Sequence, residues 1–284
     1  MASLQTLSLS AAIVGETAGP TAQAVDARWL MAYAAAVGVD DRRCFDTMRP
    51  DGPLAHPLFA VCYEWPVAVE LRHRAIGAAI APLSVHAAHH LVIHRPVRAG
   101  DTVMTTARVV GIARRPAGVL VTTRFDTVDG QRRPVTTTLH GSIYRGVTLD
   151  AEAGEHARLG APGEGRSRWE ARMEISPHAA HLYTECARIW NPIHTDIAAA
   201  RAAGLPRPIL HGTATLAMAV SHVVARDLDG EPERVREVTV RFTGTVEMPS
   251  TMTVRGLART AQRIEFDVVN RQGQRVLSRG AVVS

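Results

Sequence analysis

The stretch "ARIWNPIHTD", Ala187 to Asp196, combines residue types that suit proton transfer. Its Asn191-Pro192 pair predicts a rigid turn, and His194 follows that turn closely, so the turn fixes the direction of the imidazole. Histidine both accepts and donates protons near neutral pH. We therefore predict His194 as a general acid–base residue. We expect Asn191 to hold the turn, with its amide bonded back to the backbone.

A second chemical feature follows at Gly212, which opens the apolar segment "GTATLAMAVSHVVARDL". The first N–H groups of a helix have no partner within the helix, and its amino end carries partial positive charge. A glycine has no Cβ to keep a ligand away from the backbone. The Gly212 N–H is therefore predicted to stabilise negative charge on a carbonyl oxygen.

Two sets of elements in the same order surround these residues. Each half has a short helix, a longer apolar helix and then alternating segments rich in β-branched residues, which predict strands. Asp26 and Ser176 are the expected N-caps of the two short helices. We expect an N-terminal unit at 1–150, a linker at 151–168 rich in Gly, Ala and charge, and a C-terminal unit at 169–284. A long helix wrapped by a curled antiparallel sheet, made twice, is an α+β fold.

The segment from Tyr183 to Gly212 resembles the signature of the R-specific enoyl-CoA hydratases, the MaoC-like dehydratase family of hotdog-fold proteins. The likeness rests on the Asn-Pro-aliphatic-His turn and on "PILHG", Pro208 to Gly212; "HRPVRAGDTV" in the first half is similar to another element of the family. The resemblance implies a double hotdog acting on an acyl-CoA or acyl-carrier-protein thioester, as a hydratase or dehydratase. The resemblance implies no bound cofactor other than the pantetheine of the acyl carrier.

The sequence departs from this family at one catalytic position. Active members have a Gly-Asp pair before the Asn-Pro turn, where this chain has Arg188 and Ile189. An isoleucine transfers no proton, so the usual Asp/His pair is incomplete. Five carboxylates are candidates to replace the missing one: Glu185, Asp196, Asp40, Asp51 and Glu64. The other readings are that His194 acts alone on a more reactive substrate, that the protein is an isomerase or a pericyclase-like tailoring enzyme of polyketide-type metabolism, or that it only binds a thioester.

Further residues near the turn are candidates for substrate binding. They are Tyr183, Arg188, Ile189, Trp190 and His211. Arg188 has two readings, a bidentate partner for a substrate carboxylate or an exposed cation at a helix end. The first half lacks the turn, and Pro57 stands where a glycine would match Gly212, while Pro66 interrupts its long helix. We expect this half to have lost its own site and to widen the space for an acyl chain.

Composition limits the classes of partner. The formal charge is +5, but the basic residues are scattered and aromatic residues make up 5%, which does not favour nucleic-acid binding. Cys44, Cys62 and Cys186 are widely spaced and suggest neither disulfides nor a zinc site. His89, His90 and His94 have no acid or cysteine ligand at useful spacing, so we expect no metal. No targeting or membrane segment is evident, which predicts a cytoplasmic protein, and both a monomer and a homodimer remain open.

Overall fold

The computed structural model of the 284-residue chain describes residues 7–156 and 166–284. The middle of the predicted linker therefore lies outside the described residues, while Ala153–Gly154 of the same segment form a short strand, β8, against β4. No helix in the described ranges is both long enough and apolar enough to span a membrane.

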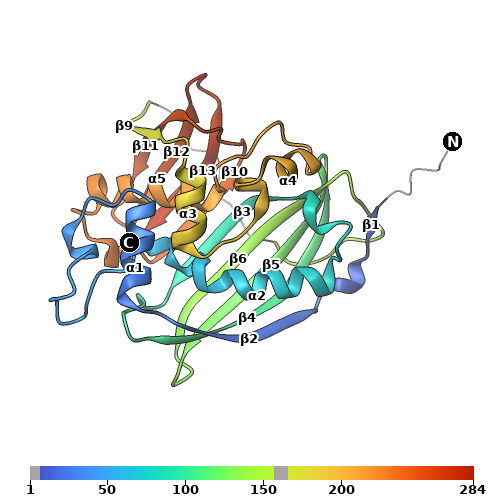
Figure 1. The fold of residues 1–284 in the computed structure, drawn as a ribbon, viewed down its shortest axis with the longest axis horizontal. Coiled ribbons are helices and arrows are strands. Elements are labelled where there is room, and N and C mark those ends of the chain that lie inside the picture. The colour runs from blue at the N-terminus through green and yellow to red at the C-terminus, as the bar shows by residue number, and fades with distance from the viewer. Residues whose placement is uncertain (1–6, 157–165) are drawn as a thin grey trace.

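The main sheet is continuous through both halves (Figure 1). Its strand order is β2-β4-β5-β6-β3-β10-β13-β12-β11-β9, and the two halves meet where β3 pairs antiparallel with β10. The N-terminal strands are β2 (Thr17–Ala24), β3 (Ser84–Ile93), β4 (Thr102–Arg115), β5 (Gly118–Asp129) and β6 (Pro134–Arg145). The C-terminal strands are β9 (Trp169–Ile175), β10 (Glu237–Phe242), β11 (Ser250–Arg259), β12 (Arg263–Asn270) and β13 (Arg275–Val283). Two further two-residue strands, β1 (Ser8–Leu9) and β7 (Thr148–Leu149), pair in parallel outside this sheet.

The halves repeat one another element by element. In each, an edge strand is followed by a short helix, a long helix and four strands, and the two strand orders are mirror images across the β3–β10 join. The short helices are α1 (Ala27–Ala36) and α3 (Ala179–Ala187), and the long ones are α2 (Ala60–Ala75) and α5 (Gly212–Asp227). One helix has no counterpart, α4 (Ile197–Ala202), which follows the turn that carries His194. This arrangement confirms the predicted α+β double hotdog.

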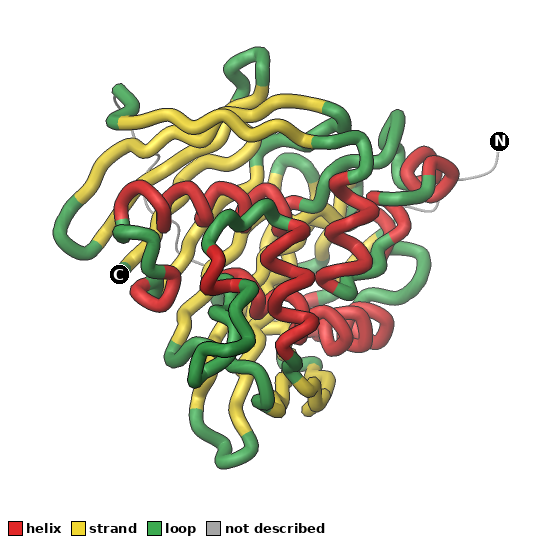
Figure 2. The backbone as a smooth tube through the Cα atoms, turned by 60° about the vertical axis from the view of Figure 1, so that its left-hand side comes forward, coloured by secondary structure: helices red, strands yellow, loops and turns green. Residues whose placement is uncertain are grey.

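The helices gather on one face of the curled sheet, as Figure 2 shows. Helix α5 is buried along much of its length, and Leu216, Ala217, Val220 and Val223 are fully inaccessible. Burial of such side chains stabilises the fold by about 1.5 to 3 kcal/mol for each large aliphatic residue. The apolar character of "GTATLAMAVSHVVARDL" therefore follows from its position between the sheet and the other helices.

The caps of the two short helices differ. Asp26 caps α1 as predicted, because its Oδ1 accepts a hydrogen bond of 2.7 Å from the Trp29 N–H. The prediction of Ser176 as the N-cap of α3 is wrong. Residues 176–178 form a turn in which the Ala179 N–H donates to the Ser176 carbonyl, so α3 begins later, after His178.

Candidate active site

The predicted turn orients His194 through one backbone contact. Residues Pro192–His194 form a single 3-10 turn after α3, and the Nδ1 atom of His194 lies 2.8 Å from the carbonyl oxygen of Ile209. A carbonyl only accepts, so Nδ1 carries the proton and Nε2 keeps its lone pair. Burial lowers the pKa of His194 to about 4, which leaves the ring neutral at neutral pH. His194 is thus in the form that a general base requires.

His211 packs against this imidazole. The two rings are stacked with centroids 3.6 Å apart, and Nε2 of His211 lies 3.3 Å from the Thr184 hydroxyl oxygen. Burial holds the pKa of His211 well below its usual value, and the neighbouring His194 lowers it further. The stack therefore holds two neutral rings side by side and limits the directions in which His194 can turn.

The amino end of α5 lies beside the same histidines. Gly212 is its first residue, and no side chain caps the helix. A Cβ at this position would lie 2.9 Å from the Phe242 ring, so a larger residue here would have to displace this side chain of β10. Tyr183 donates a hydrogen bond of 3.0 Å to the Thr213 hydroxyl oxygen, which anchors this helix end to α3. The first N–H groups of α5 are consequently held in place without a side-chain acceptor.

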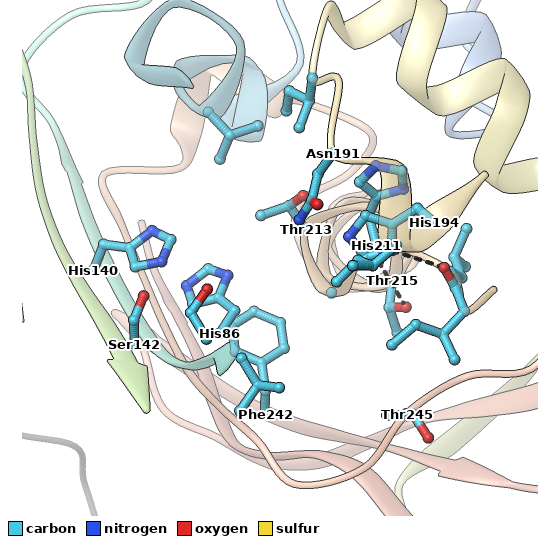
Figure 3. Close-up of a pocket in the computed structure, with 18 of the residues that line it drawn as sticks. His86, His140, Ser142, Asn191, His194, His211, Thr213, Thr215, Phe242 and Thr245 are labelled. Atoms are coloured by element: carbon cyan, nitrogen blue, oxygen red, sulfur yellow. Dashed lines mark hydrogen bonds between the residues drawn. The ribbon is translucent and has the colours of Figure 1, made fainter. Parts of the chain in front are cut away.

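A cavity of about 390 Å³ connects this helix end with the N-terminal half. Figure 3 shows Asn191, Thr213, His194 and His211 on one side of it and His86, His140 and Ser142 across from them. Residues spaced along one face of α2 form a further wall: Glu64, Ala68 and Arg72. The N-terminal half thus lines part of this cavity, and its role in widening the space for an acyl chain stays a prediction.

The five candidate carboxylates occupy very different positions. Asp196 caps α4 by accepting from the Ala198 and Ala199 N–H groups, Asp51 pairs with an arginine, and Asp40 and Glu185 are exposed. Of the five, only Glu64 lines the cavity that His194 also lines.

Glu64 is nearly inaccessible to solvent, and its Oε1 accepts a hydrogen bond of 2.6 Å from the Thr138 hydroxyl on β6. Burial raises the pKa of Glu64 to about 8, although the Thr138 bond opposes the shift. The Glu64 carboxyl group is therefore protonated at neutral pH, whereas the Nε2 atom of His194 is not. Across the described residues, no ion pair within 4.0 Å joins His194 to a carboxylate, so the acid is not hydrogen-bonded to the base as a dyad.

The predicted substrate-binding residues divide into two groups. Ile189 and His211 line the cavity. Tyr183 is fully buried in the core, and the Trp190 side chain is largely exposed. The Arg188 guanidinium stacks on the Trp29 ring, 4.1 Å from its centre, and lies 3.9 Å from an Asp26 carboxylate oxygen. These three side chains do not line the cavity.

Asn191 is the N-cap residue of the turn that carries His194, but not through the side-chain bond that we predicted. It lines the cavity, and its side chain makes no capping hydrogen bond to the turn that follows it. Figure 3 places Asn191 near Thr213, so its amide is directed toward the cavity. The amide is thus available to a ligand.

Sequence reasoning did not identify the histidines on the opposite wall. His86 and His140 lie on β3 and β6, 54 residues apart by their numbers, and neither belongs to a recognisable motif. The available signal was the density of histidines in "SVHAAHH" together with the alternation of β6, which places Thr138, His140 and Ser142 on one face.

Two family descriptions match this chain. Residues 160–278 match "MaoC like domain", and residues 12–138 match "FAS1-like, dehydratase domain region". The peroxisomal multifunctional enzyme type 2 of Drosophila melanogaster is 31% identical over 205 residues, which cover 70% of this chain and 34% of that protein. The 3-hydroxyacyl-thioester dehydratase X of Mycobacterium tuberculosis is 28% identical over 180 residues, 59% of this chain and 57% of that protein. The chain thus spans about a third of the Drosophila relative and somewhat more than half of the mycobacterial one.

Structural similarity extends over nearly the whole chain. The crystal structure of a MaoC-like dehydratase from Phytophthora capsici superposes with a TM-score of 0.83 at 22% identity, covering 95% of this chain and 96% of that one. At this identity the likeness defines the fold. The C-terminal half of the chain thus contains a MaoC-like domain, and the chain as a whole has the double hotdog fold.

Proposed function

We propose that this protein is a hydratase or dehydratase of acyl thioesters in which His194 is the general base and acid. The observation that carries the proposal is the position of His194: a neutral imidazole with a free Nε2 lines one cavity together with the uncapped amino end of α5. The name of one relative, the 3-hydroxyacyl-thioester dehydratase X of Mycobacterium tuberculosis, supports this reaction class.

In the hydration direction, the Nε2 atom of His194 takes a proton from water while the oxygen forms a bond to C3 of the 2-enoyl thioester. The electron pair of the double bond moves toward the thioester carbonyl, and the N–H groups at Gly212 stabilise the enolate oxygen. The amide of Asn191, which faces the cavity, holds the water or the thioester. Dehydration uses the same groups in reverse.

Glu64 supplies the proton that C2 receives in this scheme. A protonated carboxyl group that lines the same cavity takes over the role of the Asp that Ile189 replaces. The base comes from the C-terminal half and the acid from the N-terminal half, with the substrate between them. The Ile189 side chain then serves only as apolar wall.

The alternative is an isomerase that uses the same two groups. In that reaction His194 and Glu64 move a proton along an unsaturated acyl chain without adding water. An isomerase of this kind would exchange acyl C–H protons with solvent deuterium and yield no 3-hydroxyacyl product.

The test is loss of enoyl absorbance with crotonyl-CoA and longer 2-enoyl-CoAs, measured on the wild type, His194→Ala and the control His94→Ala. His94 is exposed and lies just outside β3. We expect His194→Ala to lower kcat by at least about 10²-fold, the usual contribution of a general base, and His94→Ala to match the wild type. Turnover by His194→Ala at the wild-type rate would refute the assignment, and the absence of hydration with every enoyl thioester would refute the function.

A further inference from the structure

Three histidines of the N-terminal half converge on one face of the sheet. His86 and His89 come from β3 and His140 from β6, and His89 lies directly opposite His140 in the antiparallel pair. In a regular strand, residues 86 and 89 would face opposite sides. The register shifts between His86 and Ala88, so Ala87 is the extra residue of a β-bulge and His86 comes to lie opposite Ser142. The bulge thereby turns His86 to the face that already carries His89 and His140.

The nitrogens of these rings are close together and suited to donate lone pairs. One ring nitrogen from each histidine lies within 4.8 Å of those of the other two. The Nε2 atom of His86 lies 3.1 Å from the Ala88 carbonyl oxygen, so Nε2 carries the proton and Nδ1 is free. A backbone carbonyl on the second ring nitrogen is the usual support of a metal-bound histidine.

His89 gives a separate reason to expect an occupant. Its side chain is 1% exposed, and within the described ranges neither of its ring nitrogens has a hydrogen-bond partner. A buried polar atom without a partner destabilises the fold, and a bound ion would remove that cost. His86 and His140 line the cavity but His89 does not, so a substrate in the cavity has access to only two of the three rings.

We propose that His86, His89 and His140 bind a divalent transition-metal ion of the zinc class, with a fourth coordination position open to the cavity. Three imidazoles with one open position are a known ligand set for zinc. Burial keeps all three histidines in the neutral, ligating form and lowers the pKa of both His89 and His140 to about 3. His90 and His94, which drew attention in the sequence, do not take part: His90 pairs with Glu237, and His94 is exposed beside Thr137.

Binding requires a local adjustment and competes with one charge. The His86 and His140 rings are stacked in parallel with centroids 3.8 Å apart, so one ring must rotate about its Cβ–Cγ bond before both lone pairs meet at one ion. The charge of Arg72 lowers the pKa of both histidines. The same charge repels a metal ion, so removing it should strengthen binding.

The test is a titration of the full chain, first stripped with a chelator, with Co²⁺ followed by its visible spectrum and with Zn²⁺ in competition with a chromophoric chelator. The variants are His89→Leu, His140→Gln and Arg72→Gln, with His94→Gln as the matched control. Thermal unfolding checks that each variant folds, and His140→Gln carries the test if His89→Leu does not fold.

We expect one ion per chain, at least 10-fold weaker binding in His89→Leu and His140→Gln, unchanged binding in His94→Gln and tighter binding in Arg72→Gln. The proposal is wrong if the wild type binds neither ion stoichiometrically, or if both histidine variants bind as well as the wild type. It is also wrong if His194→Ala, and not the variants of this cluster, abolishes binding, because the ion would then lie at the His194–His211 stack.

Discussion

The two long helices occupy equivalent places in the two hotdog units but begin differently. Helix α5 starts at Gly212, directly after His211, with its first N–H groups beside the cavity. Helix α2 starts at Ala60 after the 3-10 turn Pro57–Phe59, and Pro66 lies within it. The C-terminal unit therefore retains the helix end that suits an oxyanion, while the N-terminal unit contributes a wall with Glu64 and Arg72 along it. The two units repeat one order of elements, and in our proposal the chemistry is divided between them.

The largest effect on activity is expected from replacing Glu64, the proposed acid of the N-terminal half. Glu64→Gln keeps the size of the side chain but cannot give up a proton, so we expect kcat for hydration to fall by about 10²-fold or more. Steady-state kinetics with crotonyl-CoA measures the effect. The matched control is Glu185→Gln, which alters an exposed carboxylate, and equal activity in Glu64→Gln and the wild type would remove Glu64 from the reaction.

Blocking the access of a substrate to the amino end of α5 should have the next largest effect on activity. In Gly212→Ala the new methyl group meets the Phe242 ring and covers the first N–H, and we expect kcat/KM to fall by about 10- to 10²-fold, no more than the loss of an oxyanion donor. The double variant Gly212→Ala/Phe242→Leu separates the two causes. If it recovers full activity, the defect came from the contact with the Phe242 ring and not from the methyl group covering the N–H.

The smallest effect is expected from making α2 more like α5. Pro66→Ala restores a backbone N–H within the helix, and we expect the free energy of unfolding to rise by about 1 kcal/mol, a fraction of the usual cost of an internal proline. Urea unfolding followed by circular dichroism measures this change. Crotonyl-CoA turnover should stay within about twofold, since crotonyl is a short acyl group. A lower unfolding free energy would show that Pro66 is adapted to the shape of this helix.

Much of the fold could be predicted from local sequence. The repeated order of helices and strands and the β-branched alternation predicted an α+β unit made twice, and Asp26 predicted the start of α1. The double hotdog itself was implied by the resemblance of the segment Tyr183 to Gly212. The prediction for Ser176 failed because the same residue types are preferred at helix N-caps and in turns. In the structure Ser176 begins a turn, and α3 starts only after His178. Arg188 could not be assigned either, because its position depends on Trp29, which lies in the other half.

Only the C-terminal part of the candidate site could be predicted from the sequence. Asn191, His194 and Gly212 belong to one continuous motif and could be named in advance. Glu64 was one of five equivalent carboxylates, because its burial depends on how α2 packs over β6. The alignment of His86 with His140 depends on a bulge at Ala87, which strand alternation cannot reveal.

The pH dependence of kcat/KM for the wild type and Glu64→Gln tests the division of chemistry most directly. The base His194 is unprotonated above its pKa of about 4, and the acid Glu64 is protonated below its pKa of about 8. The account predicts a wild-type plateau between these values and a fall above about pH 8 that is absent from the residual activity of Glu64→Gln. If kcat/KM of Glu64→Gln decreases above pH 8 as that of the wild type does, Glu64 is not the acid. The same holds if kcat/KM of the wild type does not decrease above pH 8, and in either case the two halves do not share the reaction.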